Sequence, residues 1–245
     1  MPNVVCAALE RFQHPTLMRL QHSPHKWLAP AHRAKVQYSS TALTTPALDK
    51  RGITCVQIIA STFLYIVRAI DHTMLVALNE IGSEQALPTT DTIQKTKMLM
   101  DYMATQPDAV IQFHASDICL HIDSNAAYLV QPKARSRAAG HFCLSDNPPS
   151  DNTRPTPSPN GPVITKCQTI RTVMASAAEA ETGEIFINSQ QAIPIRTALT
   201  NMGHPQPPTP IKTNSASSGI ACQRPWSVSG ACCRRGCHRR SRCWS

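Results

Sequence analysis

The chain has 245 residues, of which 42% are hydrophobic, 16% are charged and 20 are prolines. This length is enough for one large domain or two small ones, but a charged fraction below the usual quarter, together with so many prolines, excludes a uniformly well-packed chain and predicts long loops. The formal net charge of +9 belongs to the ends, with +4 in residues 1–50, −1 in residues 51–221 and +6 in residues 222–245. Basic ends can bind nucleic-acid phosphates without sequence preference, although a solvated tail is the more frequent explanation.

The cysteines and the apolar stretches indicate the compartment. Five of the ten cysteines lie in the last 24 residues, and the other five occur singly among apolar neighbours, as is typical of buried free thiols in a reducing compartment. No secretory signal is recognised, and the most membrane-like stretch, 53–70, contains Gln57 and Arg68. We therefore expect an intracellular protein, cytoplasmic or nuclear, that does not contact a membrane.

The first half of the chain predicts a helical unit. Residues 1–50 show no sustained hydrophobic period, so we expect an irregular lead-in. Apolar residues then recur at helical spacing over 54–70 and 72–86, and a third helix begins at Asp91 as N-cap and ends before Pro107. Residues 51–107 are thus expected to form a small helical subdomain without catalytic residues.

After Pro107 the hydrophobic period changes from 3.6 to 2. In the second predicted strand, Leu120 and Ile122 face one side while His121 and Asp123 face the other. One helix is expected over 175–199, interrupted near Pro194, with an inner face of Ile185, Phe186, Ser189, Ala192 and Ile193. A proline-rich stretch at 147–162 predicts a flexible insertion. The expected fold class is α/β, with strands at 110–115, 118–123, 138–144, 162–170 and 209–213.

Three blocks of sequence carry a resemblance to a known family. They are FLYIVRAIDHTMLVALNEIGSEQA (63–86), HASDICLHIDSNAAYLVQPKARSRAAGHFCLS (114–145) and the stretch 173–214, which contains SAAEAE. In this order they resemble the end of the reverse transcriptase and the start of the ribonuclease H domain of copia-type retrotransposon polyproteins, over about residues 23–221. The resemblance implies a reverse-transcriptase-derived segment at 51–107 and, at 108–221, an incomplete ribonuclease H-like mixed sheet with one long helix.

The resemblance also implies a site. Ribonuclease H cuts the RNA strand of an RNA–DNA hybrid with two divalent cations, usually Mg²⁺, held by clustered carboxylates. Asp123 and Glu179 match two of these carboxylates and are the expected catalytic and metal-binding residues. Without the family, Asp123 would be interpreted as a turn or cap residue and Glu179 as a partner of the helix dipole. Glu181 and Glu184 are interpreted as surface charges.

The family pattern breaks after the fourth strand. Residues 213–220 read TNSASSGI, with no aspartate where the family has its third carboxylate, and Asn125 stands where a second acid usually follows the first strand. Glu184 is the last acidic residue of the chain, so the fourth carboxylate is missing as well. We therefore expect a retrotransposon remnant that binds Mg²⁺ unproductively and has no independent catalysis.

Residues 222–245 depart most from the family. They contain six Arg and five Cys, but the cysteines are too closely spaced for a structural zinc site, so no zinc is expected. The segment is interpreted as a disordered tail unrelated to the domain, from a shifted reading frame or an altered splice. Two alternatives stay open: a ribonuclease H that receives its missing acids from elsewhere, and a fragment that binds nucleic acid weakly through this tail.

Overall fold

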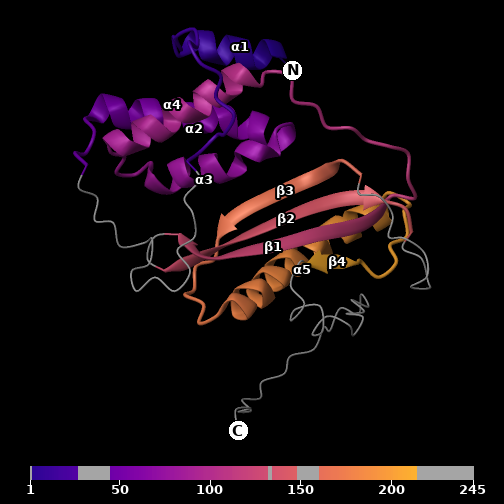
Figure 1. Ribbon diagram of the computed structural model, residues 1–245. Helices are drawn as coiled ribbons and strands as arrows, with labels where there is room; N and C mark the ends of the chain where they lie inside the picture. The colour runs from indigo at the N-terminus through magenta and orange to yellow at the C-terminus, as the bar shows by residue number, and fades with distance from the viewer. Residues whose placement is uncertain (1, 27–44, 132–133, 148–159, 214–245) are drawn as a thin grey trace.

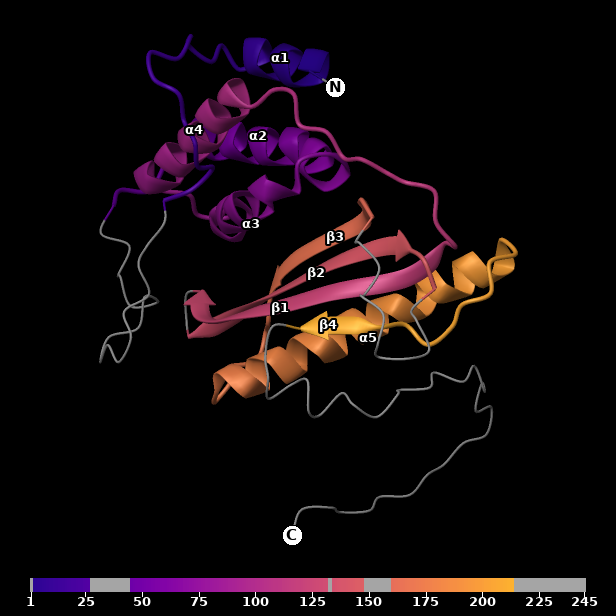
Figure 2. The same cartoon turned by 45° about the vertical axis from the view of Figure 1, so that its right-hand side comes forward.

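The computed structural model describes residues 2–26, 45–131, 134–147 and 160–213. Within these ranges a unit of helices lies over one face of a four-stranded sheet, and one long helix, α5, crosses the opposite face (Figure 1). A view turned by 45° shows the same three layers (Figure 2). The chain is therefore mixed α/β, as expected from its change of hydrophobic period.

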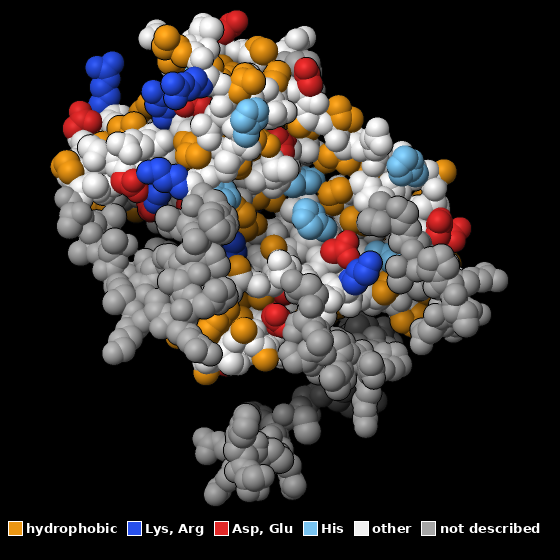
Figure 3. All heavy atoms as spheres, in the orientation of Figure 1, with side chains coloured by type: hydrophobic (Ala, Val, Ile, Leu, Met, Phe, Trp, Pro, Cys, Tyr) orange, Lys and Arg blue, Asp and Glu red, His pale blue; other side chains and the backbone are white. Residues whose placement is uncertain are grey.

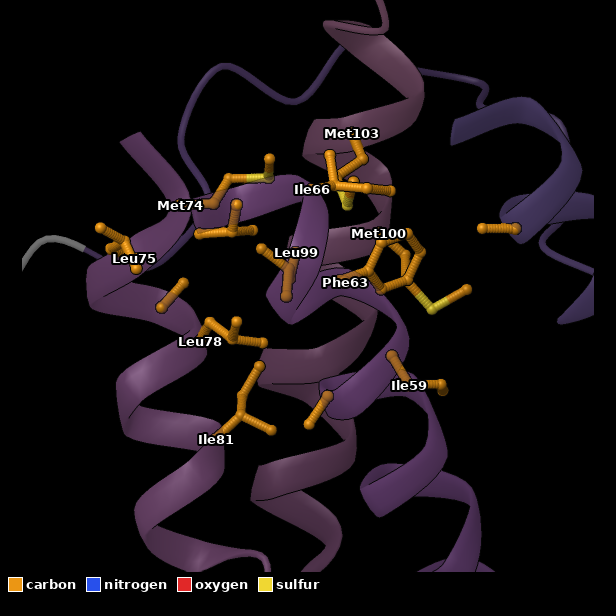
Figure 4. Packing of buried hydrophobic residues seen from close by; sticks show 14 of the residues in the cluster. Ile59, Phe63, Ile66, Met74, Leu75, Leu78, Ile81, Leu99, Met100 and Met103 are labelled. Carbon is orange, nitrogen blue, oxygen red and sulfur yellow. The ribbon is translucent and has the colours of Figure 1, made fainter. Parts of the chain in front are cut away.

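The helical unit contains the larger of two hydrophobic cores. It is built from α1 (Pro2–Arg11), α2 (Lys50–Ala69), the 3-10 turn η2 (His72–Met74), α3 (Leu75–Glu84) and α4 (Thr90–Thr105). Phe63 and Leu99 are fully buried, and Met74, Ile81 and Met103 are nearly so. Figure 4 shows these side chains pointing toward one another from α2, η2, α3 and α4. Of the apolar stripe predicted for α2, Ile59, Phe63, Ile66 and Val67 are buried, whereas Ile58 is 39% exposed.

Two helix starts differ from their predicted positions because side chains cap the backbone earlier. The Oδ1 atom of Asp49 accepts a hydrogen bond of 2.8 Å from the backbone N–H of Gly52, so α2 begins at Lys50. Thr89, not Asp91, is the N-cap of α4, and its backbone N–H donates to the hydroxyl of Thr92 at 3.0 Å. These caps use orphan N–H groups that periodicity does not reveal.

The prediction of an irregular lead-in is wrong for residues 2–11, which form α1. Among residues 3–11, only Val5 and Ala8 are buried, one turn apart, against the core of the helical unit. Two small buried residues give a weak periodic signal. The formation of α1 therefore depends on its packing against the helical unit, which its own sequence pattern does not reveal.

The sheet has the strand order β3-β2-β1-β4. Strands β1 (Cys119–Gln131) and β2 (Arg135–Ser145) pair antiparallel, as do β2 and β3 (Pro162–Thr169), whereas β4 (Ile211–Thr213) pairs parallel to β1. The parallel pair requires a crossover, and α5 (Ala177–Asn201) supplies it. The second core lies between this helix and the sheet and contains Leu120, Ile122, Phe142, Ala192 and Leu199.

The predicted strand at 110–115 is not formed. The backbone of His114 is paired with a side chain instead: its N–H donates to Asn160 Oδ1 at 2.8 Å, and Asn160 Nδ2 donates to its carbonyl oxygen at 2.7 Å. Phe113, which a half-buried strand would place against the core, is largely exposed. Alternating residues without a neighbouring strand do not make a ladder.

Helix α5 begins at the N-cap Ser176 and continues through Pro194, where an interruption was expected. Its predicted inner face is only partly correct: Ala192 is buried, and Ile185 and Ser189 are half-buried. Phe186 is 60% exposed and Ile193 is 49% exposed. The buried residues are Ala180, Glu184, Asn188, Ala192 and Leu199.

Two predictions of disorder fall on residues that the structure leaves undescribed. Of the insertion at 147–162, residues 148–159 lie outside the described ranges, and so does the whole of the tail at 222–245. The TNSASSGI segment also lies outside them apart from Thr213. These expectations stay predictions.

One described helix, α2, is long and apolar enough to span a membrane. Six of its residues are nevertheless buried in the core of the helical unit. A helix in a protein core can have the same length and composition as a membrane-spanning helix.

Replacement of Phe63 by Ala should lower the free energy of unfolding by about 3–5 kcal/mol, because the ring is fully buried in the larger core and its loss leaves a cavity. Tyr65→Ala on the same helix is the control, since Tyr65 is 64% exposed. Urea denaturation followed by circular dichroism measures both. Equal effects of the two substitutions would contradict the packing described for α2.

Candidate functional site

Asp123 lies in the middle of β1, on the face of the sheet that looks toward the helical unit. Its neighbours Ile122 and Ser124 contact α5, so the alternation of the strand directs Asp123 to the other side. In the register of the sheet, Asp123 stands opposite His141 of β2 and Lys212 of β4. The predicted division of this strand into two faces is confirmed.

Asp123 lies near His141 and Cys143 of β2, and the pKa values of both groups are shifted. Burial lowers the pKa of His141, as does the nearby imidazole of His72, whose ring centroid is 6.2 Å away, while Asp123 acts in the opposite direction. Burial, helped by the charge of Asp123, raises the pKa of Cys143 to about 11. A thiol with this pKa is not a nucleophile near neutral pH.

Glu179 lies in the first turn of α5, where its carboxylate caps the helix. Oε2 accepts a hydrogen bond of 2.6 Å from the backbone N–H of Ala175, and the backbone N–H of Glu179 donates to Ser176 Oγ at 3.1 Å. The side chain is exposed. These contacts are those of a residue that stabilises a helix N-terminus.

Asp123 and Glu179 are not brought together. Asp123 faces the helical unit, whereas Glu179 belongs to the helix on the opposite face of the sheet (Figure 2). The expectation that both carboxylates contact one cation is therefore not met. Among the residues that the structure describes, no three His, Cys, Asp or Glu side chains form a group that could hold a metal ion.

A different carboxyl group, that of Glu184, occupies the space between α5 and the sheet. Its side chain is 0% exposed, so its interpretation as a surface charge is wrong. Glu184 Oε1 accepts hydrogen bonds from Ser124 Oγ at 2.5 Å and from Asn188 Nδ2 at 3.1 Å. Asn188 Nδ2 also contacts Ser124 Oγ at 2.9 Å and the carbonyl oxygen of Ala139 at 3.2 Å. We call Ser124, Glu184 and Asn188 the buried polar triad.

Burial between α5 and the sheet keeps Glu184 mostly in its neutral form below neutral pH. Burial raises the pKa of Glu184 from the ordinary 4.5 to about 7, and the charge of Glu181 adds to this, while hydrogen bonds from Ser124, the Asn125 backbone and Asn188 act against it. The second oxygen, Oε2, is buried without a hydrogen-bond partner. An enclosed carboxyl group of this kind is a structural element, because nothing described here gives a substrate access to it.

The signal for the triad was present in the sequence but ambiguous. Ala180, Glu184, Asn188 and Ala192 recur every four residues, which places them on one helical face. Because two of the four are polar, this face looks solvent-exposed, and hydrophobicity favours the more apolar set that includes Phe186 and Ile193. On the sheet side, a glycine at position 140 leaves room for the amide of Asn188, since a Cβ atom there would lie 2.6 Å from Asn188 Oδ1.

Comparison with known proteins identifies no relative. No protein-family model, no curated protein and no solved structure matches the chain. The geometry of the described residues and the resemblance of the three sequence blocks are therefore the observations on which a function can be argued.

Substitution of Glu184 by Gln should remove a pH dependence of stability. Because the folded-state pKa is raised, the folded protein binds more protons than the unfolded chain between pH 4.5 and about 7. The stabilisation is complete below this window and is lost as the pH rises through it, by roughly 3 kcal/mol at most. Urea denaturation at a series of pH values measures the slope.

The matched control for that substitution is Glu10→Gln, because Glu10 is exposed on α1. The control should keep the wild-type slope between pH 4.5 and 7, the window set by Glu184. A Glu184→Gln protein with an unchanged slope would show that this carboxyl group does not titrate as its burial requires.

The glycine that admits Asn188 gives a second test. Gly140→Ala should destabilise the protein by about 1–3 kcal/mol, because the added methyl group overlaps the amide of Asn188. Gly82→Ala is the control: it lies inside α3 with nothing within 4 Å of the new Cβ atom, so the substitution should be neutral or stabilising by up to about 1 kcal/mol. Thermal unfolding compares the two, and a neutral Gly140→Ala would refute the close packing of Asn188.

Proposed function

We propose that the chain is a remnant of a copia-type retrotransposon polyprotein, consisting of the end of the reverse transcriptase and an incomplete ribonuclease H-like domain, with no catalysis of its own. The observation that supports this most is the element order β1, β2, β3, α5, β4. Strand, strand, strand, helix, strand is the order in which a ribonuclease H-like domain begins. The block at 114–145 falls on β1 and β2, and the block at 173–214 falls on α5 and β4.

The loss of catalysis is argued from charge. A two-metal site has to hold four positive charges in fixed positions. Asp123 and Glu179 face different sides of the sheet, Glu184 is enclosed by Ser124 and Asn188, and no acidic residue follows Glu184 in the chain. Substrate phosphates add negative charge, but they do not fix the cations for in-line attack. These carboxylates therefore do not hold Mg²⁺ where it could support cleavage. This intracellular remnant could bind an RNA–DNA hybrid but would not cut it.

The purified protein should not cleave an RNA–DNA hybrid in Mg²⁺ or in Mn²⁺. A hybrid with a 5′-labelled RNA strand, incubated with the protein and resolved on a denaturing gel, measures this, and an active ribonuclease H in parallel shows that the substrate is competent. Asp123→Asn is the diagnostic variant. Cleavage by the unmodified chain that disappears in Asp123→Asn would contradict the proposal, whereas cleavage that persists would indicate a contaminating nuclease.

A further inference from the structure

Helix α5 is held on the sheet by different interactions in its two halves. In the second half, residues 192–201, the buried side chains are apolar and belong to the second core. None of residues 177–191, all of which the structure describes, belongs to that core. The buried residues of this first half are Ala180, Glu184 and Asn188, so its contact with the sheet depends mainly on the buried polar triad.

The two halves meet at a gap in the hydrogen-bond ladder of the helix. Pro194 lies inside α5 and has no N–H group, so the carbonyl oxygen of Gln190 lacks the helical donor that would lie four residues later. A proline inside a helix is the usual place for a bend. Residues 177–191 can therefore move away from the sheet while residues 192–201 stay on it.

The carboxyl group of Glu184 lies among neutral partners. It is hydrogen-bonded to the Ser124 hydroxyl, the Asn188 amide and the backbone of Asn125, and its Oε2 atom is buried without a hydrogen-bond partner. The charged group that acts on it, Glu181, is itself an acid and disfavours a second negative charge. An ionised Glu184 is thus a buried charge without a cation, which is strongly destabilising.

Two other titratable side chains reach α5 from the sheet, and neither neutralises this charge. Lys166 of β3 donates to Gln191 Oε1, and the Tyr128 hydroxyl of β1 donates to the carbonyl oxygen of Ala175 at 3.0 Å. The described parts of β2 and β4 present no titratable side chain on this face of the sheet. On the face drawn in Figure 3, Lys and Arg side chains gather mainly over the helical unit, away from the lower edge where α5 begins.

We propose that Glu184 is a pH-operated latch: residues 177–191 stay on the sheet while it is protonated, and they detach far more often, by bending at Pro194, when it ionises. Residues 192–201 keep their place because their contacts are apolar. Burial raises the pKa of Glu184 from 4.5 to about 7, so the latch is closed at acidic pH and is released as the pH rises through this window. The device does not depend on the retrotransposon ancestry of the chain.

Hydrogen–deuterium exchange of the full chain, followed by mass spectrometry of peptic fragments, measures how often each segment opens. After correction for the intrinsic exchange rate, the opening of residues 177–191 should increase by up to about tenfold per pH unit from about pH 5 to about pH 7. At about pH 7 this half should open at least about tenfold more often than residues 192–201, since those open only when the apolar core opens. Equal opening of the two halves in the unmodified protein would overturn the proposal.

Two substitutions separate the latch from the hinge. Glu184→Gln removes the ionisable group, so the opening of residues 177–191 should stay within about twofold over the same pH range, whereas the exposed control Glu10→Gln should keep the wild-type increase. An increase that persists in Glu184→Gln would show that another group operates the change. Pro194→Ala restores the missing N–H, so both halves should then open equally often, within about threefold. A first half that still opens separately in this variant would refute the hinge.

Discussion

The hydrogen bonds between Ser124, Glu184 and Asn188 set the position of the long helix on the sheet. Ser124 belongs to β1, and the amide of Asn188 also reaches the backbone of Ala139 in β2, so α5 is joined to both central strands. Buried polar groups must be paired with one another, because an unpaired one would be destabilising by about 1–3 kcal/mol. Only one rotation of α5 about its axis pairs these groups. That rotation then sets the direction in which every other side chain of the helix points.

That rotation explains why the sheet has so small a core. With Glu184 and Asn188 turned inward, Phe186 and Ile193 are directed outward, and apolar contact between helix and sheet is left to Ala192, Leu199 and the strands. The helical unit has a much larger apolar core. It contacts the sheet through Cys167 of β3, which packs against that core, and through polar pairs such as Arg137 with Glu80 at 3.3 Å. Stability is therefore concentrated in the helical unit, whereas the polar contacts give the sheet its specific arrangement.

Periodicity predicted the elements better than their ends or their faces. The alternation of Leu120, Ile122 and Asp123 was sufficient to assign both faces of β1, because a strand leaves each residue only two directions. A helix directs its side chains all around its axis, so the inner face of α5 depends on whether Glu184 or Phe186 is buried. Hydrophobicity alone predicts Phe186, whereas Glu184 is the buried residue. Residues 110–115 alternate like a strand, but within the described ranges they form no ladder with another strand. Strand formation depends on tertiary partners that a local pattern does not contain.

The separation of Asp123 from α5 follows from the same alternation of side chains along β1. Moving Asp123 to the α5 face would require a shift of one residue along β1, and that shift would turn Leu120 and Ile122 away from the core and break the bond between Ser124 and Glu184. The arrangement that buries the apolar side chains of β1 is thus the arrangement that keeps Asp123 apart from every carboxylate of α5. In this chain the folded sheet and a site shared between Asp123 and a carboxylate of α5 exclude each other, so the proposed lack of catalysis would follow from how the fold is held together as much as from the missing acids.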